Sequence, residues 1–242
     1  MKILKYKKLK DSKYYLYFDN GLELELYEDT ILKYELLLNK DFVLDEVVSY
    51  NDRIKCYYDG LKFIKSSLKS VFEVRNHLLN NKHNESDVLF SVEKMISNGF
   101  LNDMVYAKSY INTKLALSDN GPRIIKSELE RAGISFDIID EVMEDFTDDI
   151  QLEKINKLIN KMIISNRNKS GLFLQKHIIN HLILKGYNSS LIYDVINDYS
   201  FDNDNKIYEK EKDKLRKRLS LKYSGDKLDF EINNKLRSRG FY

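Results

Sequence analysis

The chain has 242 residues, of which 43% are hydrophobic and 32% are charged, a composition typical of a soluble helical protein. It holds no apolar run of the roughly 18 residues that a membrane-spanning helix requires, and its basic N-terminus lacks the apolar core of a signal peptide. The single cysteine, Cys56, excludes an internal disulfide framework and fits a reducing cytoplasm, and a net charge of +2 does not by itself indicate a nucleic-acid-binding protein.

The first 27 residues alternate in the manner of β-strands. Asn20-Gly21 stands between two alternating runs, which predicts a hairpin turn there. An earlier strand is expected at Ile3–Leu9. The sequence therefore predicts a small antiparallel sheet at the N-terminus.

Two helices are expected after this sheet. Acidic residues and a capping oxygen at Glu28-Asp29-Thr30 predict a helix through Leu38. A second helix is expected from Leu44 through Asp59, with an extension to Ser67 as the alternative. We interpret residues 1–65 as a small β-plus-helix domain.

From residue 68 onward the sequence reads as helix throughout, because apolar residues recur at i, i+3 and i+4. Pro122, the only proline, follows Gly121 and predicts a helix start, since the first helical position needs no N–H. Gly133 predicts the end of that helix.

Four short segments resemble one another: LLNNKHN, LERAGIS, LILKGYN and LRSRGFY. Each ends a short helix with a basic residue near the stop, and the stop residues His83, Gly133, Gly186 and Gly240 lie about fifty residues apart. This period, with three helices in each, predicts a helical repeat array. The predicted units are 66–120, 121–170 and 171–224, with 225–242 as a partial repeat that caps the array.

No pattern in the sequence points firmly to catalysis. Glycine-rich phosphate loops, nucleophile elbows and CxxC pairs are absent. His177 and His181 stand four apart on a predicted helix and could face one metal ion, but the residue after the first is Ile178 rather than the glutamate of a zinc protease. Ordinary helix histidines are the alternative, and we predict no cofactor, no metal and no enzyme.

The distribution of charge indicates binding instead. Eight acidic residues and no base lie between Asp137 and Glu153, whereas bases dominate from Lys206 to Lys222. Basic residues on successive helices could form one surface for phosphate backbones, or could be separate solvated faces. The candidate binding residues are Arg123, Lys126, Arg131, Lys154, Lys157, Lys161, Arg167, Lys169, Lys212, Lys214, Arg216, Lys217, Arg218, Lys222, Arg237 and Arg239.

The stretch from Asn98 to Ser135 resembles the signature of the RecX family, regulators of the RecA recombinase. Gly99-Phe100-Leu101-Asn102-Asp103 resembles its G-[FY]-[LI]-[DN]-D step, and Ala107 and Tyr110 match the small residue and the aromatic residue of its next helix. The run from Gly121 to Leu129 resembles G-P-x-x-I-x-x-E-L, and Gly133-Ile134-Ser135 resembles the stop that follows.

The resemblance extends over residues 66–242. Ser70 to Leu79 is similar to the opening of the family's first repeat, and the N-terminal region is similar to the extension of longer members. One departure stands out, because the family usually carries several bases before the Gly-Pro step and here Lys114 stands alone, with Asp119 nearby. We therefore expect the second and third units to supply the bases that contact phosphate.

The resemblance implies three tandem three-helix repeats in an elongated, curved array. It also implies a cytoplasmic protein that needs no cofactor, catalyses nothing and binds RecA and the RecA–single-stranded DNA filament. Family members inhibit strand exchange, ATP turnover and coprotease action, which places them in DNA repair and SOS control. We expect a monomer that can also bind single- or double-stranded DNA and does not bind membranes. The alternative is a helical-repeat scaffold for protein interactions without a nucleic-acid role.

Overall fold

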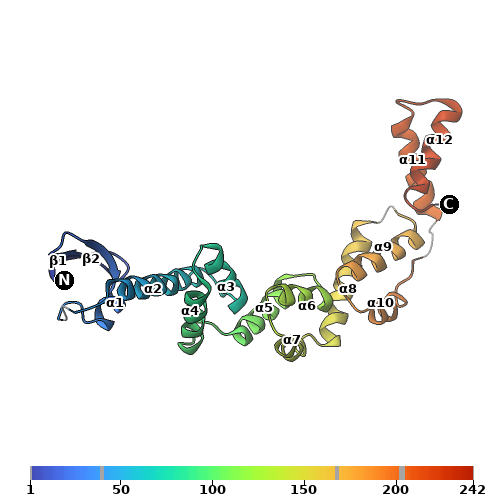
Figure 1. Ribbon diagram of the computed structural model, residues 1–242. Coiled ribbons are helices and arrows are strands. Elements are labelled where there is room, and N and C mark those ends of the chain that lie inside the picture. The colour runs from blue at the N-terminus through green and yellow to red at the C-terminus, as the bar shows by residue number, and fades with distance from the viewer. Residues whose placement is uncertain (1, 39–40, 167–168, 202–204, 242) are drawn as a thin grey trace. The chain divides into compact units, whose positions relative to one another are not determined.

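The N-terminal region is a three-stranded antiparallel sheet in the order β1-β2-β3, formed by Ile3–Lys8, Lys13–Phe18 and Glu23–Tyr27 (Figure 1). The computed structural model describes residues 2–38, 41–166, 169–201 and 205–241. The predicted Asn20-Gly21 turn joins β2 to β3, with Gly21 at a φ of 81°. The hairpin expected from the sequence is confirmed.

Helix α1, Glu28–Lys33, is shorter than predicted. The helix was expected to run through Leu38, but Glu35 has a φ of 46° and the Leu36 N–H donates to the Ile31 carbonyl at 3.1 Å. This reversal ends the helix and buries Leu36 in a small core. The other buried members of that core are Leu16, Phe18, Leu26, Ile31 and Val47.

The first trio of helices follows the long helix α2, Leu44–Ile64. It consists of α3, Val71–Asn80, α4, Glu85–Ser97, and α5, Asp103–Leu117. A capping box of Ser70 and Glu73 begins α3, and the Asn84 side chain caps α4. Helix α2 packs on α3 and α4, and its buried residues Cys56 and Tyr57 share a core with Val74, Leu78, Val88, Val92, Met95 and Leu101. Burial raises the pKa of the Cys56 thiol, as expected of a packed side chain.

Two further trios and a last helix complete the chain. The second trio is α6, Pro122–Arg131, α7, Phe136–Met143, and α8, Asp148–Ser165. The third trio is α9, Gly171–Leu184, α10, Ser189–Ile196, and α11, Asn205–Leu219. The last helix is α12, Gly225–Arg237. The described residues thus hold twelve helices and one small sheet, which confirms a mostly helical fold with an N-terminal antiparallel sheet.

The chain divides into two compact units. One consists of Met1–Ala107 with Arg131–Ser135, and the other of Lys108–Glu130 with Phe136–Tyr242. The repeat boundaries at residues 66, 121, 171 and 225 remain predictions.

A close contact recurs where the first helix of a trio ends. Gly186, after α9, has a φ of 88°, and a Cβ there would lie 2.8 Å from the backbone nitrogen of Ile124 in α6. The Gly121 N–H donates to the Lys185 carbonyl at 2.7 Å, and the Arg123 N–H donates to the Gly186 carbonyl at 3.1 Å. Only glycine fits here, because both the backbone conformation and the lack of space exclude a side chain.

The same arrangement occurs at two other turns. A Cβ on Gly240, after α12, would overlap Phe173 at the start of α9, and the Ser170 N–H donates to the Arg239 carbonyl at 3.0 Å. Gly133, after α6, lies equally close to Phe72 in α3. In the first trio the left-handed residue is Lys82, with a φ of 66°, and not His83 as the sequence alignment of stops predicted. The His83 N–H instead donates to the Leu78 carbonyl, as Tyr187 N–H does to Leu182.

Candidate nucleic-acid interface

The basic residues of α6 have three different environments. The Arg123 Nη2 donates to the Ile183 carbonyl at 3.1 Å, near the end of α9. The Lys126 Nζ lies 2.7 Å from Asp140 Oδ1 of α7, and this hydrogen bond raises the pKa of Lys126. Arg131 is exposed. Lys126 is therefore neutralised locally, and Arg123 helps to hold α6 against α9.

The predicted basic face of α8 is divided in the same way. The Lys154 Nζ donates to the carbonyls of Leu115 and Ser118, at 2.6 and 2.9 Å, and so caps the C-terminal end of α5. Burial lowers the pKa of Lys154. Lys157 is exposed and has no acidic partner among the described residues, and Lys161 lies 3.9 Å from Asp119 with 73% of its side chain exposed.

A group of side chains surrounds the loop before Pro122, and we call it the junction cluster: Asp119, Lys154, Lys161, His181 and Lys185. The Lys185 Nζ lies 3.3 Å from Asn120 Oδ1. The pKa of His181 is lowered, first by burial and then by the neighbouring charges of Lys185 and His177, with a smaller contribution from Lys161. The loop itself carries no base from residue 115 to residue 122, so α8 and α9 supply the positive charge around it.

Tyr187 holds the loop before Pro122 in place. Its hydroxyl donates to the Asp119 carbonyl at 3.1 Å, and burial raises the pKa of Tyr187 to about 12. The phenol therefore stays a hydrogen-bond donor across the physiological pH range.

Several charged residues of α11 contact other residues of the protein. Glu211 is 5% exposed and accepts hydrogen bonds from Lys214, at 2.9 Å, and from Arg239. The Arg216 Nη2 lies 3.0 Å from Asp229 Oδ1 of α12. The Nζ atoms of Lys212 and Lys169 lie over the rings of Tyr208 and Phe173, at 5.5 and 5.4 Å from the centroids.

Other basic residues of this hairpin differ. Lys217 and Arg218 at the end of α11, and Lys222 in the turn after it, are exposed and have no acidic partner within the described parts of the chain, and the same is true of Arg237 in α12. We call Lys217, Arg218, Lys222 and Arg237 the hairpin cations. Arg167, the remaining predicted residue, lies outside the described residues.

The predicted histidine pair is not part of a recognisable metal centre. Within residues 2–38, 41–166, 169–201 and 205–241, no group of three or more His, Cys, Asp or Glu side chains could hold a metal ion. His177 is exposed, and its ring stacks on that of Phe173 with centroids 6.3 Å apart. None of the described helices is long and apolar enough to cross a membrane.

Comparisons with known proteins agree on one family. The family model described as the second three-helix domain of RecX matches residues 102–143. The chain is 28% identical over 182 residues to the regulatory protein RecX of Listeria innocua, covering 74% of this chain and 68% of that protein. It is also 28% identical over 226 residues to the regulatory protein RecX of Lactococcus lactis, covering 89% and 84%.

Solved structures show the same fold. A crystal structure of regulatory protein RecX superposes with a TM-score of 0.72 at 24% identity, covering 82% of this chain and 99% of that one. A crystal structure of RecX from Lactobacillus salivarius superposes with a TM-score of 0.58 at 29% identity, covering 62% and 97%. The chain is thus similar to RecX proteins in both sequence and fold.

The residues that carry the RecX resemblance have structural roles here. Asp103 Oδ1 accepts a hydrogen bond from the Val71 N–H at 2.9 Å, which caps α3, and burial raises the pKa of this carboxyl. The Tyr110 hydroxyl and the Lys114 Nζ both lie 2.9 Å from Glu128 Oε2 and join α5 to α6. In this chain, the residues of the signature therefore hold helices together.

Sequence reasoning missed several residues that the structure brings into view. Lys185 precedes the stop Gly186, and the recurrence of a base before each stop was the available signal. Phe230, with Lys227 nearby, lies on the solvent-facing side of α12. Its signal was an aromatic residue out of phase with the apolar stripe of Ile232 and Leu236.

Proposed function

We propose that this chain binds RecA and RecA–single-stranded DNA filaments and inhibits recombinase, ATPase and coprotease activity, acting in DNA repair and SOS control. It acts in the cytoplasm as a monomeric, non-enzymatic regulator that needs no cofactor and binds no membrane. Similarity to regulatory proteins named RecX supports the regulatory role.

The observation that carries the nucleic-acid part of the proposal is the set of hairpin cations. They are exposed and have no acidic partner in the described parts of the chain, so their charges are available to phosphates. Lys157 and Lys161 on α8 are the next candidates. Lys126, Lys154, Lys214, Arg216 and Arg239 contribute less, because each already contacts a carboxylate or a carbonyl.

The test is the RecA ATPase rate on single-stranded DNA, measured with increasing amounts of the protein. We expect the rate to fall, and the double variant Lys217→Glu/Arg218→Glu to need a much higher concentration for the same effect. Lys126→Ala is the matched control, because Asp140 already neutralises Lys126. An unchanged ATPase rate, together with no binding of the chain to RecA filaments, would favour the scaffold alternative.

A further inference from the structure

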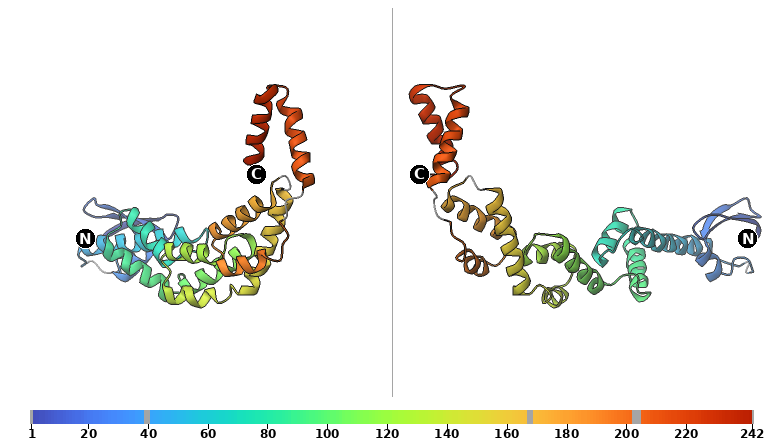
Figure 2. Two further views of the ribbon diagram at one scale, coloured as in Figure 1. Left: turned by 90° about the vertical axis from the view of Figure 1, so that its right-hand side faces the viewer. Right: turned by 180° about the vertical axis from the view of Figure 1, so that it is seen from behind.

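Helices α11 and α12 form an antiparallel hairpin with a core of its own (Figure 2). Its buried residues are Leu215, Leu219, Ile232, Leu236 and Phe241. The face of α12 that carries Ile232 and Leu236 packs against α11. The ion pair of Arg216 with Asp229 joins the two helices at their surface. These contacts determine which face of α12 meets solvent.

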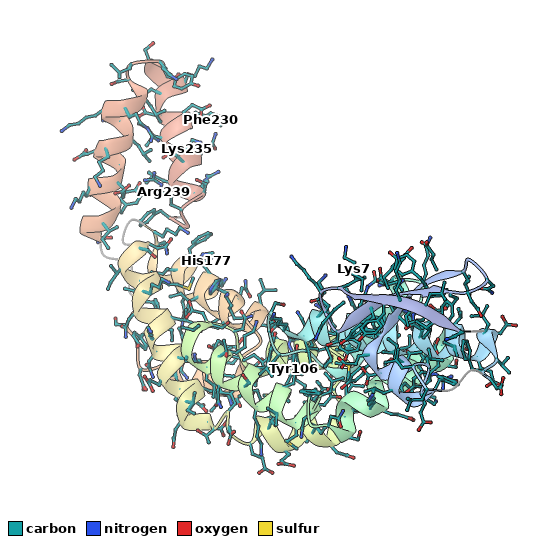
Figure 3. All side chains as sticks on the ribbon, turned by 90° about the vertical axis from the view of Figure 1, so that its left-hand side faces the viewer. Lys7, Tyr106, His177, Phe230, Lys235 and Arg239 are labelled. Carbon is teal, nitrogen blue, oxygen red and sulfur yellow. The ribbon has the colours of Figure 1, made fainter. Side chains whose placement is uncertain are left out.

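Phe230 lies at the centre of that solvent-facing side. At about 100° per residue, its direction differs from that of Ile232 by about 160° and from that of Leu236 by about 120°. The side chain is 63% exposed and projects from the hairpin (Figure 3). An aromatic ring exposed to water on a helix buries little apolar surface, so it contributes little to the stability of the fold.

The neighbours of Phe230 on the same face are polar or charged. Lys227 at i−3, Asn234 at i+4 and Arg237 at i+7 surround the ring, with one acidic residue, Asp226, at i−4. The Lys227 Nζ also lies 5.6 Å from the centroid of the Tyr223 ring. Lys227 and Arg237 are about 15 Å apart along the helix axis, one on each side of the ring.

This pattern favours nucleic acid over a protein groove as the occupant. A helix that docks in a protein groove presents apolar anchors at i, i+3, i+4 and i+7, but on α12 the corresponding positions beyond Phe230 are Asn233, Asn234 and Arg237. Proteins that hold single strands combine an exposed aromatic ring for the bases with cations for the phosphates. Phe230 with Lys227 and Arg237 has that composition.

We propose that Phe230 is a base-stacking residue for single-stranded DNA, with Lys227 and Arg237 contacting the flanking phosphates. This inference rests on the proposed function, and it names the ligand of the solvent-facing side of α12. It adds a contact with the bases to the phosphate contacts of the hairpin cations.

Equilibrium binding of the full chain to fluorescein-labelled dT20 tests the proposal. We expect Phe230→Ala to weaken binding about tenfold, the effect of losing one stacked base. Leu221→Ala is the matched control, because Leu221 is an 85% exposed apolar residue near the same hairpin turn, and it should leave the affinity unchanged. On an abasic oligonucleotide of equal length, wild type and Phe230→Ala should bind equally.

A tryptophan variant gives a second readout. The chain has no tryptophan, so Phe230→Trp places a single fluorophore at the proposed contact. We expect dT20 to be bound with nearly wild-type affinity and to quench the tryptophan emission, and the abasic strand to leave the emission unchanged.

Three results would overturn the inference while leaving the proposed function intact. These are equal dT20 affinity of wild type and Phe230→Ala, an equal loss on the abasic strand, or a loss confined to RecA filaments, which would indicate a protein contact. Failure of the wild-type chain to bind either dT20 or RecA filaments would instead refute the proposed function, and this inference with it.

Discussion

Helix α8 and the end of α11 both carry closely spaced basic residues, yet the two regions differ in what those residues contact. On α8, Lys154 is half-buried and donates to two carbonyls at the end of α5. At the end of α11, Lys217 and Arg218 are exposed without acidic partners among the described residues, as is Lys222 in the turn that follows. Similar spacing of basic residues along a helix therefore does not imply the same role. A side chain that hydrogen-bonds to a carbonyl or a carboxylate of the protein is less available to a ligand.

The same contrast exists within α11. Glu211 pairs with Lys214 of the same helix and with Arg239, and Arg216 pairs with Asp229 of α12, whereas Lys217 and Arg218 have no acidic partner among the described residues. The paired residues thus tie the hairpin together, and the last residues of α11 are available for a ligand. The following measurements test this division and the corresponding one on α8, from the largest expected effect to the smallest.

Glu211→Gln should reduce the free energy of unfolding by about 3 kcal/mol. The change leaves Arg239, whose side chain is only 24% exposed, without its carboxylate partner. Urea unfolding gives the value. Arg216→Ala, which breaks the exposed pair with Asp229, is the control and should cost no more than about 0.5 kcal/mol. Equal losses for the two variants would contradict a special role for Glu211.

The triple variant Lys217→Ala/Arg218→Ala/Lys222→Ala should weaken binding to dT20 by about ten- to a hundredfold at low salt. Three lost phosphate contacts should also reduce the slope of log affinity against log salt by about 2. Fluorescence anisotropy at several salt concentrations measures both. The midpoint of thermal unfolding should not change, since these side chains make no contact with an acid in the described chain. An unchanged salt slope would exclude these residues from the interface.

Lys154→Met should reduce the free energy of unfolding by about 2 kcal/mol, because it removes a charged donor from two carbonyls and keeps most of the apolar stem. Lys157→Met, three residues away and exposed, should change stability by less than about 0.5 kcal/mol. Its expected effect is on DNA binding instead, with the salt slope reduced by about 0.7. A reversal of these two outcomes would mean that α8 presents Lys154 rather than Lys157 to the ligand.

His181 should produce the smallest effect, a dependence on pH. Its pKa is lowered in the folded chain, first by burial, so the unfolded chain takes up the proton more readily. The stability that this provides is complete above the unfolded pKa of about 6.5 and decreases as the pH falls below it. Urea unfolding at pH 7.5 and 5.5 should show a smaller decrease for His181→Gln than for wild type.

Phosphate bound near the junction cluster would raise the pKa of His181, since an anion favours the charged ring. An NMR titration of the His181 ring with and without dT20 measures this shift directly. No change in the His181 pKa on binding would place the DNA away from the junction cluster and leave the hairpin as the contact.

Local signals in the sequence predicted the main elements of the fold. The Asn20-Gly21 turn, the start of α6 at Pro122 and the turns at Gly186 and Gly240 depend on backbone conformations that a few adjacent residues determine. The end of α1 at Lys33 and the left-handed Lys82 were missed. Glutamate and lysine are not typical of positive φ, so Glu35 and Lys82 gave no local signal. The chain reverses after α1 because Leu36 is buried among residues from β2, β3 and α2.

By itself, the sequence determined the mostly helical character of the chain, the N-terminal antiparallel sheet and several of the turns, because these properties follow from neighbours along the chain. Only the tertiary structure decided which cations remain available. Lys154 donates to a carbonyl 39 residues away, and Arg239 reaches Glu211 across the hairpin. The physical reason is that a cation is less available when the fold places a carboxylate or a carbonyl within about 3 Å of it. The spacing of residues within one helix does not predict such a partner.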